Sequence, residues 1–345
     1  MKILIVRFSS IGDIVLTTPV IRCLKQQLPN ANIHFLTKPA YYSVLASNPY
    51  LHKIHLLQND WQQIIKSLQN ESFDCIIDLH YNLRSLRIKK SLKAVKSYSF
   101  HKINAQKWLL TAFKINVLPK AHIVDRYLAA AQPLGIVNDG KGLDYFISSD
   151  DEVDSDQLPL SHCAGYIAVV IGATYNTKKL PLHKLKDLCS LINYPIILLG
   201  GKEDEKKGDD IAAVNDIRIF NACGKFSLNQ SADLVHKARL VITHDTGLMH
   251  IAAAFQKPII SVWGNTVPAF GMTPYYGEQN ESKEKESALL NKNLKPQSIM
   301  SEVKKLYCRP CSKIGFKKCP LGHFKCMEKQ DLPSVNRSVI SLLSS

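Results

Sequence analysis

Two polar turns hold the residues best placed to do chemistry, one at the start of the chain and one two-thirds along it. At each, an apolar stretch stops at small and polar residues and a helical pattern begins. In an open α/β sheet such turns lie at the carboxyl edge of the strands, where ligands bind and helix N-termini present free N–H groups. Two such turns, one in each half, indicate two nucleotide-fold domains facing one substrate. The turns contain Ser9, Ser10, Gly12 and Asp13, and Asp245, Thr246, Gly247, Leu248 and His250.

The second turn has the composition of a pyrophosphate seat. Thr246 is suited to cap the following helix through its side-chain oxygen, and Gly247 lets a ligand approach the backbone closely. His250 lies one turn further on the same helix face. The alternative is a capped helix with a solvated histidine.

Asp13 in the first turn has two interpretations. A carboxylate at a helix N-terminus is the usual partner of the helix dipole. Because the turn follows the first strand, Asp13 is equally placed to act as a general base.

Two further strand ends carry charge. Lys178 follows the strand expected at Tyr166–Ile171 and suits a phosphate, although surface lysines are common. The pair Gly200-Gly201 follows another strand and precedes Glu203 and Glu205, either of which suits a ribose hydroxyl. No G-x-G-x-x-G or G-x-x-x-x-G-K-[ST] pattern is present, which argues against a dehydrogenase and a P-loop NTPase.

A basic region follows the strand expected at Phe73–Leu79. It begins with His80, Asn82 and Arg84 and continues through Arg87, Lys89, Lys90, Lys93 and Lys96. Such a run is usually a solvated helix face. Here it also suits an anionic acceptor.

The composition describes a globular protein with an excess of positive charge. The chain has 345 residues, enough for two domains, with 46% hydrophobic residues and a formal net charge of +15. Such charge favours anionic partners, and no nucleic-acid-binding motif accompanies it. Without a signal segment or membrane span, we expect a cytoplasmic protein that contacts a membrane surface at most.

The nine cysteines fall into two groups. We expect the scattered Cys23, Cys75, Cys163, Cys189 and Cys223 to be small buried residues. The others form the pattern Cys308-x2-Cys311-x7-Cys319-x6-Cys326, with His323 nearby. In a cytosolic chain this suggests a structural metal, zinc above all, before a disulfide, but the spacing is not a standard zinc pattern. A compact cysteine-rich loop is the alternative.

The apolar pattern alternates strand and helix in both halves, which predicts parallel βαβ units. We place domains at 1–155 and 160–330, an acidic linker at 150–159, a charged surface loop at Glu278–Glu286 and a terminal helix in 331–345 that packs back on the first domain. The other expected strands are Ile3–Val6, Ile33–Leu36, Pro195–Leu199, Leu240–Thr243 and Pro258–Val262. The other expected helices are Ile14–Leu28, Trp61–Leu68, Leu182–Ile192, Leu228–Ala238 and His250–Phe255.

Taken together, these motifs resemble the heptosyltransferase family, inverting glycosyltransferases of the lipopolysaccharide core. The opening ILIVRFSSIGDIVLTTP is similar to the family's N-terminal signature, and DTGLMHIAAA at 245–254 to its most specific motif. Thr177-Lys178 with Pro181, and Asn221-x-x-Gly224, fit as well. The chain departs from the family at Trp263–Met272, where a Gly-Pro-Thr-Asp-Pro type of turn is common, and in Asp78-Leu79-His80.

The resemblance implies a GT-B fold of two Rossmann-like domains and a role for each motif residue. It implies Asp13 as catalytic base and Lys178 as the lysine that contacts the donor phosphates, with no metal or other cofactor. The acceptor would meet His80, Asn82 and Arg84. The implied donor-binding residues are Ser9, Ser10, Gly12, Thr177, Glu205 (or Glu203), Asp245, Thr246, Gly247, Leu248 and His250.

The implied partners are a nucleotide-sugar donor, for which the resemblance implies ADP-heptose, and an anionic lipid-linked saccharide acceptor. We expect a monomer at the cytoplasmic face of the inner membrane that binds no nucleic acid. Two other functions stay open: a nucleotide-sugar epimerase on the same scaffold, and a binding module without activity. Intact Asp13 and DTG motifs argue against the second.

Overall fold

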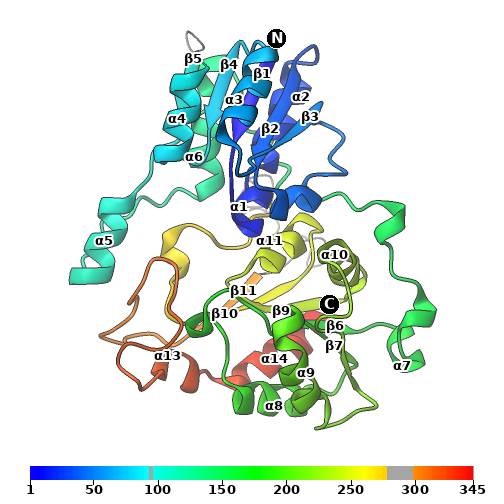
Figure 1. Cartoon of the computed structure of the whole chain (residues 1–345). Coiled ribbons are helices and arrows are strands. Elements are labelled where there is room, and N and C mark those ends of the chain that lie inside the picture. The colour runs from blue at the N-terminus through cyan, green and yellow to red at the C-terminus, as the bar shows by residue number, and fades with distance from the viewer. Residues whose placement is uncertain (93–95, 278–297, 345) are drawn as a thin grey trace, which may run out of the picture. The chain divides into compact units, whose positions relative to one another are not determined.

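The chain forms two compact α/β units in a computed structural model that describes residues 1–92, 96–277 and 298–344 (Figure 1). The first comprises Met1–Ile103 and Ala121–Phe146, and the second Asn104–Lys120 and Ile147–Ser345. The division differs from the boundary expected near residue 155, because a segment of the first half, 104–120, has its contacts in the second unit. The expected loop at Glu278–Glu286 and Lys93 of the basic run lie outside the described residues.

The first unit is built on a five-stranded parallel sheet in the order β3-β2-β1-β4-β5. Residues of the central strand β1 are fully buried, as expected for a parallel sheet covered on both faces. Leu4 and Val6 pack in one cluster with Ile64 and Ile88 from two covering helices. The strands are β1 (Lys2–Val6), β2 (Asn32–Thr37), β3 (Lys53–Leu56), β4 (Cys75–Asp78) and β5 (Lys96–Ser99).

The expected helix Ile14–Leu28 is two helices in the structure. They are α1 (Ile11–Val15) and α2 (Thr18–Gln27). The helical hydrogen bonding is interrupted just before Pro19, which lies in the first turn of α2. Proline is tolerated there because the first N–H groups of a helix have no intrahelical acceptor. The remaining helices of this unit are η1 (Pro39–Val44), α3 (Trp61–Asn70), α4 (Leu83–Ser91), α6 (Ile123–Ala129) and η2 (Gln132–Leu134).

The second unit is built on a six-stranded parallel sheet in the order β11-β10-β9-β6-β7-β8. The strands are β6 (Ile167–Val170), β7 (Ile196–Leu199), β8 (Ile219–Asn221), β9 (Leu240–His244), β10 (Ile259–Trp263) and β11 (Ser298–Glu302). Its α-helices are α5 (Asn104–Phe113), α7 (Leu160–Cys163), α8 (Leu182–Leu191), α9 (Glu205–Ala212), α10 (Leu228–Lys237), α11 (Gly247–Ala254), α13 (Lys325–Glu328) and α14 (Leu332–Leu343). Its 3-10 turns are η3 (Ser149–Asp151), η4 (Ser155–Gln157), η5 (Asn176–Lys178), η6 (Lys202–Asp204) and η7 (Pro268–Phe270).

The terminal helix α14 belongs to the second unit. Its buried residues Val335, Val339 and Leu342 join the core made by β6, β7, β9 and α8. This contact replaces the expected packing of residues 331–345 on the N-terminal domain. The apolar spacing of Val335, Val339 and Leu342 on one helix face is what requires a buried partner.

One expectation about the scattered cysteines is wrong. Cys23, Cys75, Cys189 and Cys223 are buried, but Cys163 is exposed. It lies at the end of the four-residue helix α7, which presents little apolar surface to the core.

Candidate functional site

Four polar loops leave the carboxyl edge of the second sheet side by side. In the strand order β10-β9-β6-β7, the loop after β10 carries Thr266, the loop after β9 Asp245, the loop after β6 Lys178 and the loop after β7 Glu205. The right-handed crossovers of a parallel sheet bring such loops to one edge. Residues far apart in the sequence therefore form one row of polar groups.

Lys178 and Asp245 form the centre of this row. Lys178 Nζ lies 2.7 Å from Asp245 Oδ2 and 3.3 Å from the Asp245 carbonyl oxygen. The hydroxyl of Thr266 donates to the same Oδ2 at 2.9 Å. Both side chains are mostly buried, at 17% and 13% exposure, so the pair is only weakly screened by solvent. Thr266 lies in the segment where the chain departs from the family pattern.

The helix α11 begins at the Asp245 turn, but Thr246 does not cap it. Thr246 has the extended backbone of a cap residue, yet its hydroxyl pairs with that of Thr243 at 3.2 Å. The first amides of α11, from Gly247 and Leu248, are thus left without this side-chain acceptor, and their residues are half-buried. A helix N-terminus in this condition suits an anion.

His250 is buried at 2% exposure, so the alternative of a solvated histidine is wrong. It lies one turn into α11, on an apolar helix whose neighbours Met249 and Ile251 are also buried. Its side chain is therefore part of the packed base of the turn.

Thr177 and Glu205 are engaged within the second unit. Thr177 is buried, its hydroxyl accepts from Phe316 N at 2.8 Å, and its own N–H donates to the Phe316 carbonyl. Glu205 pairs with Lys202 at 2.6 Å in a partly exposed ion pair. Thr177 thus anchors the loop that carries Lys178. Glu205 keeps a half-buried carboxylate at the end of the row, whereas its rival Glu203 is exposed.

His244 is a positioning residue that the sequence did not reveal. Its Nε2 accepts from Leu180 N at 2.9 Å, which ties the loop after Lys178 to β9. Burial, together with the charges of Lys207 and Lys179, lowers the pKa of His244 to about 3, so the ring stays neutral and remains an acceptor. Apolar spacing could not identify this residue, because His244 occupies an ordinary buried strand position.

Asp13 in the first unit is held by three contacts at the turn after β1. Arg7 Nη2 lies 2.8 Å from its Oδ1, and the amide and hydroxyl of Ser10 donate to its Oδ2 at 3.1 and 2.9 Å. Burial alone would raise the pKa of Asp13, but the Arg7 charge and the Ser10 hydrogen bonds lower it overall. The carboxylate is therefore ionised at neutral pH. It places a negative charge in the first turn of α1, where the helix dipole favours it, and at the carboxyl end of β1.

Arg7 is itself fixed by the backbone around it. Its Nη1 donates to the Leu79 carbonyl and its Nε to that of Ser9, and its guanidinium carbon lies 5.7 Å from the centre of the Tyr127 ring. Gly12 is buried beside it, and Ser9 is half-buried. The structure thus brings Ser9, Ser10, Gly12 and Asp13 together around Arg7, a residue to which the sequence analysis assigned no role.

The candidate acceptor residues follow β4 in the same unit. The Asn82 side chain accepts from Ser85 N at 2.9 Å and begins α4, so its oxygen is occupied in capping. The ring of His80 packs on Phe8, and burial, with the charge of Arg7, lowers its pKa to about 4. Arg84 is exposed. Of the three, Arg84 alone presents a charge to solvent.

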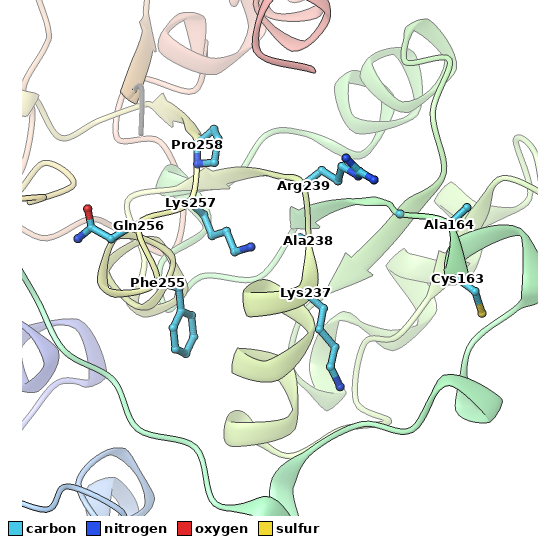
Figure 2. Close-up of a pocket in the computed structure, with 10 residues that line it drawn as sticks. Cys163, Ala164, Lys237, Ala238, Arg239, Phe255, Gln256, Lys257 and Pro258 are labelled. Atoms are coloured by element: carbon cyan, nitrogen blue, oxygen red, sulfur yellow. The ribbon is translucent and has the colours of Figure 1, made fainter. Parts of the chain in front are cut away.

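A pocket of the second unit lies elsewhere (Figure 2). It has a volume of about 510 Å³ and is lined by Gly165, Arg239 and Pro258, which precede β6, β9 and β10. These are the amino ends of the strands, the edge opposite to Asp245 and Lys178. Open α/β sheets bind ligands at the carboxyl ends, so this pocket is not the candidate site.

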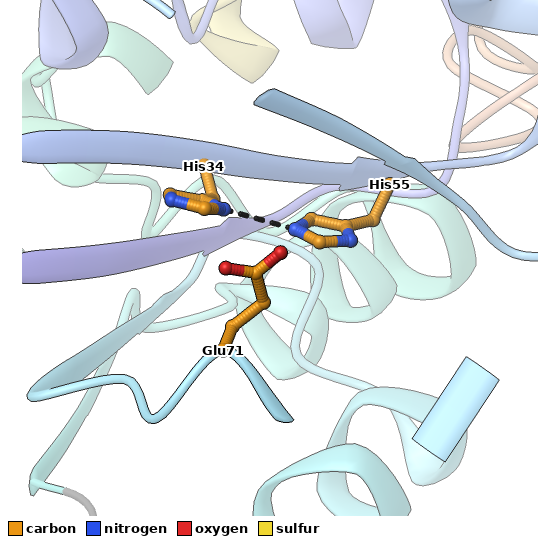
Figure 3. Close-up of side chains that lie close together, drawn as sticks. All are labelled: His34, His55 and Glu71. Carbon is orange, nitrogen blue, oxygen red and sulfur yellow. Dashed lines mark hydrogen bonds between the residues drawn. The ribbon is translucent and has the colours of Figure 1, made fainter. Parts of the chain in front are cut away.

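A second cluster combines His34, His55 and Glu71 in the first unit (Figure 3). His34 Nδ1 and His55 Nε2 share a hydrogen bond of 3.0 Å. Glu71 is held by Lys53 at 2.6 Å and Lys2 at 3.3 Å. The shared hydrogen bond occupies His34 Nδ1 and His55 Nε2, whereas His34 Nε2 has no partner among the described residues. The two lysines compete with any cation for the carboxylate.

Two parallel α/β units, each with polar residues at the carboxyl edge of its sheet, fit the two-domain GT-B fold of glycosyltransferases. The model of glycosyltransferase family 9 (heptosyltransferase) matches residues 61–303, and the chain belongs to this family.

Relatives of known function and structure agree. Lipooligosaccharide heptosyltransferase 2 of Haemophilus influenzae is 28% identical over 296 residues, covering 78% of this chain and 85% of the relative. The family 9 glycosyltransferase structure of Veillonella parvula has a TM-score of 0.74 at 19% identity, covering 100% and 98% of the two chains. The structure of E. coli ADP-heptose lps heptosyltransferase II has a TM-score of 0.72 at 20% identity, covering 99% and 98%.

No helix among the described residues is both long enough and apolar enough to cross a membrane.

Proposed function

We propose that this chain transfers a heptose from ADP-heptose to the core saccharide of a lipopolysaccharide or lipooligosaccharide, with inversion at the anomeric carbon. The observation that carries the proposal is the row of Thr266, Asp245, Lys178 and Glu205 at one sheet edge, beside the N-terminus of α11. The names of the two heptosyltransferases compared above support the choice of sugar, nucleotide and acceptor.

The donor diphosphate is assigned to Lys178 and the first amides of α11. As the bond from the anomeric carbon to the diphosphate oxygen breaks, its electron pair stays on the leaving ADP. A lysine cation and backbone N–H groups stabilise this developing charge, as the donors of an oxyanion site do. The half-buried carboxylate of Glu205 is assigned to the ribose hydroxyls. His250 and Thr177 are buried, so we assign them to packing beneath the donor-binding loops rather than to contact with the donor.

Asp13 is assigned as the general base. It takes the proton of the acceptor hydroxyl while that oxygen bonds to the anomeric carbon. Its ionised state at neutral pH suits this role, and Ser10 and Arg7 fix its orientation. Ser9, Ser10 and Gly12 form the turn that holds it.

The acceptor is assigned to the first unit. Arg84 and its exposed neighbours on α4, Arg87 and Lys90, form a basic face that suits the phosphates of an anionic saccharide lipid. We propose that the protein works as a monomer at the cytoplasmic face of the inner membrane, bound there by charge, and that it does not bind nucleic acid.

The decisive experiment measures turnover of ADP-heptose with a heptose-deficient lipopolysaccharide acceptor. We expect Asp13→Asn to lower kcat by about 10²–10⁴-fold, the range for loss of a general base, while the Kd for ADP changes less than threefold. We expect Lys178→Met to raise the Kd for ADP at least tenfold. Lys206→Met removes an exposed lysine of α9 and should leave both quantities unchanged.

Three outcomes contradict the proposal. Near wild-type kcat for Asp13→Asn makes Asp13 a helix cap only. Conversion of the donor to an epimer without acceptor identifies an epimerase, and no turnover of any donor leaves a binding module.

A further inference from the structure

The four clustered cysteines line one small cavity of the second unit. Cys308, Cys311, Cys319 and Cys326 surround a volume of about 30 Å³, together with Asn265 and His323. The space suffices for a single ion or water. None of the four cysteines is in a disulfide. Four thiols around one ion-sized space are the ligand set of a structural zinc or iron centre.

Asn265 in the cavity wall lacks a hydrogen-bond partner. Its side chain is 1% exposed, and among the described residues neither Nδ2 nor Oδ1 has a partner. Buried side-chain amides are almost always paired, because burying them otherwise is costly. An amide N–H beside a sulfur cavity is satisfied when the sulfurs are thiolates, and metal-bound thiolates accept such bonds.

His323 is arranged as a second donor to sulfur. Lys325 N donates to its Nδ1 at 3.1 Å, so the proton of the neutral ring resides on Nε2. Nε2 lies 3.8 Å from Cys308 Sγ. The imidazole therefore faces the sulfur with an N–H group and leaves metal ligation to the four cysteines.

Two cations lie near the cavity. Lys114 Nζ lies 2.7 Å from the Pro310 carbonyl oxygen and 3.4 Å from that of Cys308. Arg309 is part of the lining and also pairs with Glu302 at 2.7 Å. Four thiolates around a divalent ion carry a net charge of −2. Nearby cations reduce the cost of holding that charge away from bulk water.

Binding requires the sulfurs to move inward. In a tetrahedral site the sulfurs lie 2.3 Å from the metal and thus about 3.8 Å apart. In the structure no three of these cysteine and histidine ligand atoms lie within 4.8 Å of one another. Cys326 is fixed in α13, whereas the other three lie on the irregular chain between β11 and α13, which can contract toward it.

We propose that residues 308–326, the cysteine segment, bind one thiophilic divalent metal ion through the thiolates of Cys308, Cys311, Cys319 and Cys326. Asn265 and His323 complete the site as N–H donors to sulfur.

The cysteine segment also braces the loops of the candidate donor site. Arg309 donates from Nε to the Gly264 carbonyl at 2.6 Å and from Nη2 to that of Thr266 at 2.9 Å. Phe316 is bound to Thr177, beside Lys178. Gly264 is so close to the Thr177 carbonyl that a Cβ there would lie 2.6 Å from it. Metal binding therefore stiffens the supports of Lys178 and Thr266. This second step rests on the proposed donor site.

Metal content of the full-length protein tests the first step without reference to activity. Purified under reducing conditions, the wild type should contain one zinc or iron per chain by elemental analysis. After removal of that ion, Co²⁺ should produce the thiolate-to-cobalt absorption band with an end point of one equivalent. Cys319→Ser should lose most of the metal and the band. Cys163→Ser, which removes an exposed thiol outside the segment, should keep both.

The Co²⁺ titration keeps the test valid if Cys319→Ser does not fold, because it uses the wild type. Neither zinc nor iron in the isolated protein, together with no charge-transfer band, overturns the proposal. So does a band that persists in folded Cys319→Ser.

Donor kinetics test the bracing step. Removal of the metal should raise the KM for the sugar nucleotide at least fivefold with a smaller change in kcat, and restored metal should reverse it. An unchanged KM overturns the bracing step while the metal site stands. An inactive wild type that still binds one Co²⁺ contradicts the proposed function and leaves the metal site intact.

Discussion

Lys178 Nζ lies 2.7 Å from Asp245 Oδ2, so the cation assigned to the donor diphosphate already has an anionic partner. Thr266 fixes the same carboxylate oxygen. A diphosphate that binds here must share the lysine with a carboxylate that repels it. The pair therefore holds Lys178 in place and limits how tightly the diphosphate product is retained.

Asp245→Asn should separate these two effects. Removing the negative charge should lower the Kd for ADP severalfold, because repulsion between carboxylate and phosphate disappears and Lys178 keeps its charge. Turnover should fall, because the tighter product leaves more slowly. Calorimetric titration of ADP at two salt concentrations measures the first effect. Weaker ADP binding in a folded Asp245→Asn protein would mean that the carboxylate chiefly positions Lys178.

Arg7→Met should change the pH dependence of turnover. The attraction of Arg7 lowers the pKa of Asp13 against the opposing effect of burial. Without Arg7, only the Ser10 hydrogen bonds oppose the effect of burial, and the pKa of Asp13 rises. The wild type should therefore keep kcat/KM as the pH falls from 7 to 5, whereas the variant should approach a loss of about tenfold per pH unit below its new pKa.

Arg7→Lys is the matched variant for that prediction, since it keeps the charge at Asp13 and should retain the wild-type profile. Melting curves exclude unfolding as the cause. Superimposable pH profiles for Arg7→Met and the wild type would show that the ionisation of Asp13 does not govern turnover.

Much of this fold follows from the sequence because buried parallel strands and amphipathic helices leave clear apolar patterns. β1, β2, β4, β6, β7, β9 and β10 were predicted within a residue or two. β3, β5, β8 and β11 were missed, because they are short strands near or at the sheet edges, where burial is partial and the apolar signal is weak. The break between α1 and α2 falls at Leu16 and Thr17, just before Pro19.

The polar turns after β1, β6 and β9 were recognisable, but their internal pairing was not. Nothing in the spacing places Arg7 on Asp13, or Thr266 on Asp245, because these contacts depend on how a side chain turns back or on which strands are neighbours. The same holds for Thr246. A cap of α11 was expected from its hydroxyl, but the hydroxyl pairs with that of Thr243 instead. The roles of these residues in catalysis remain predictions.

The His34–His55 pair should make the first unit sensitive to acid. Burial lowers the pKa of each histidine to about 4, whereas an unfolded chain protonates histidine near pH 6.5. Between these values the unfolded state binds more protons, so the free energy of unfolding falls as the pH falls, by at most about 1.4 kcal/mol per pH unit for each histidine. Below pH 4 both the folded and the unfolded states are protonated, and the loss of unfolding free energy has reached its full value. This destabilisation is present in the wild type at pH 5 and absent at pH 7.

Urea unfolding of His55→Gln between pH 7 and pH 4.5 measures that contribution. The variant should lose stability less steeply than the wild type, because one of the two buried titrating groups is gone. His101→Gln, which removes an exposed histidine of the same unit, is the control and should follow the wild type. Parallel slopes for His55→Gln and the wild type would show that the pair does not determine acid stability.

The basic face of α4 should bind anionic membranes. Arg84, Arg87 and Lys90 are exposed, and the Arg87 guanidinium carbon lies 4.7 Å from the centre of the Trp61 ring, which holds its charge at the surface. Each cation near an anionic bilayer contributes about 1 kcal/mol. Replacing all three by glutamine should therefore lower the affinity for vesicles with anionic lipid by about 10²-fold at low salt. Co-sedimentation at two salt concentrations measures this, since binding by charge weakens as salt rises.

The matched control replaces Lys206, Lys225 and Lys318, exposed lysines of the second unit, and should retain most of the binding. Equal losses in the two triple variants would assign the binding to net charge rather than to this face. Tight binding of RNA, with no binding to vesicles even at low salt, would assign the charge to nucleic acid instead.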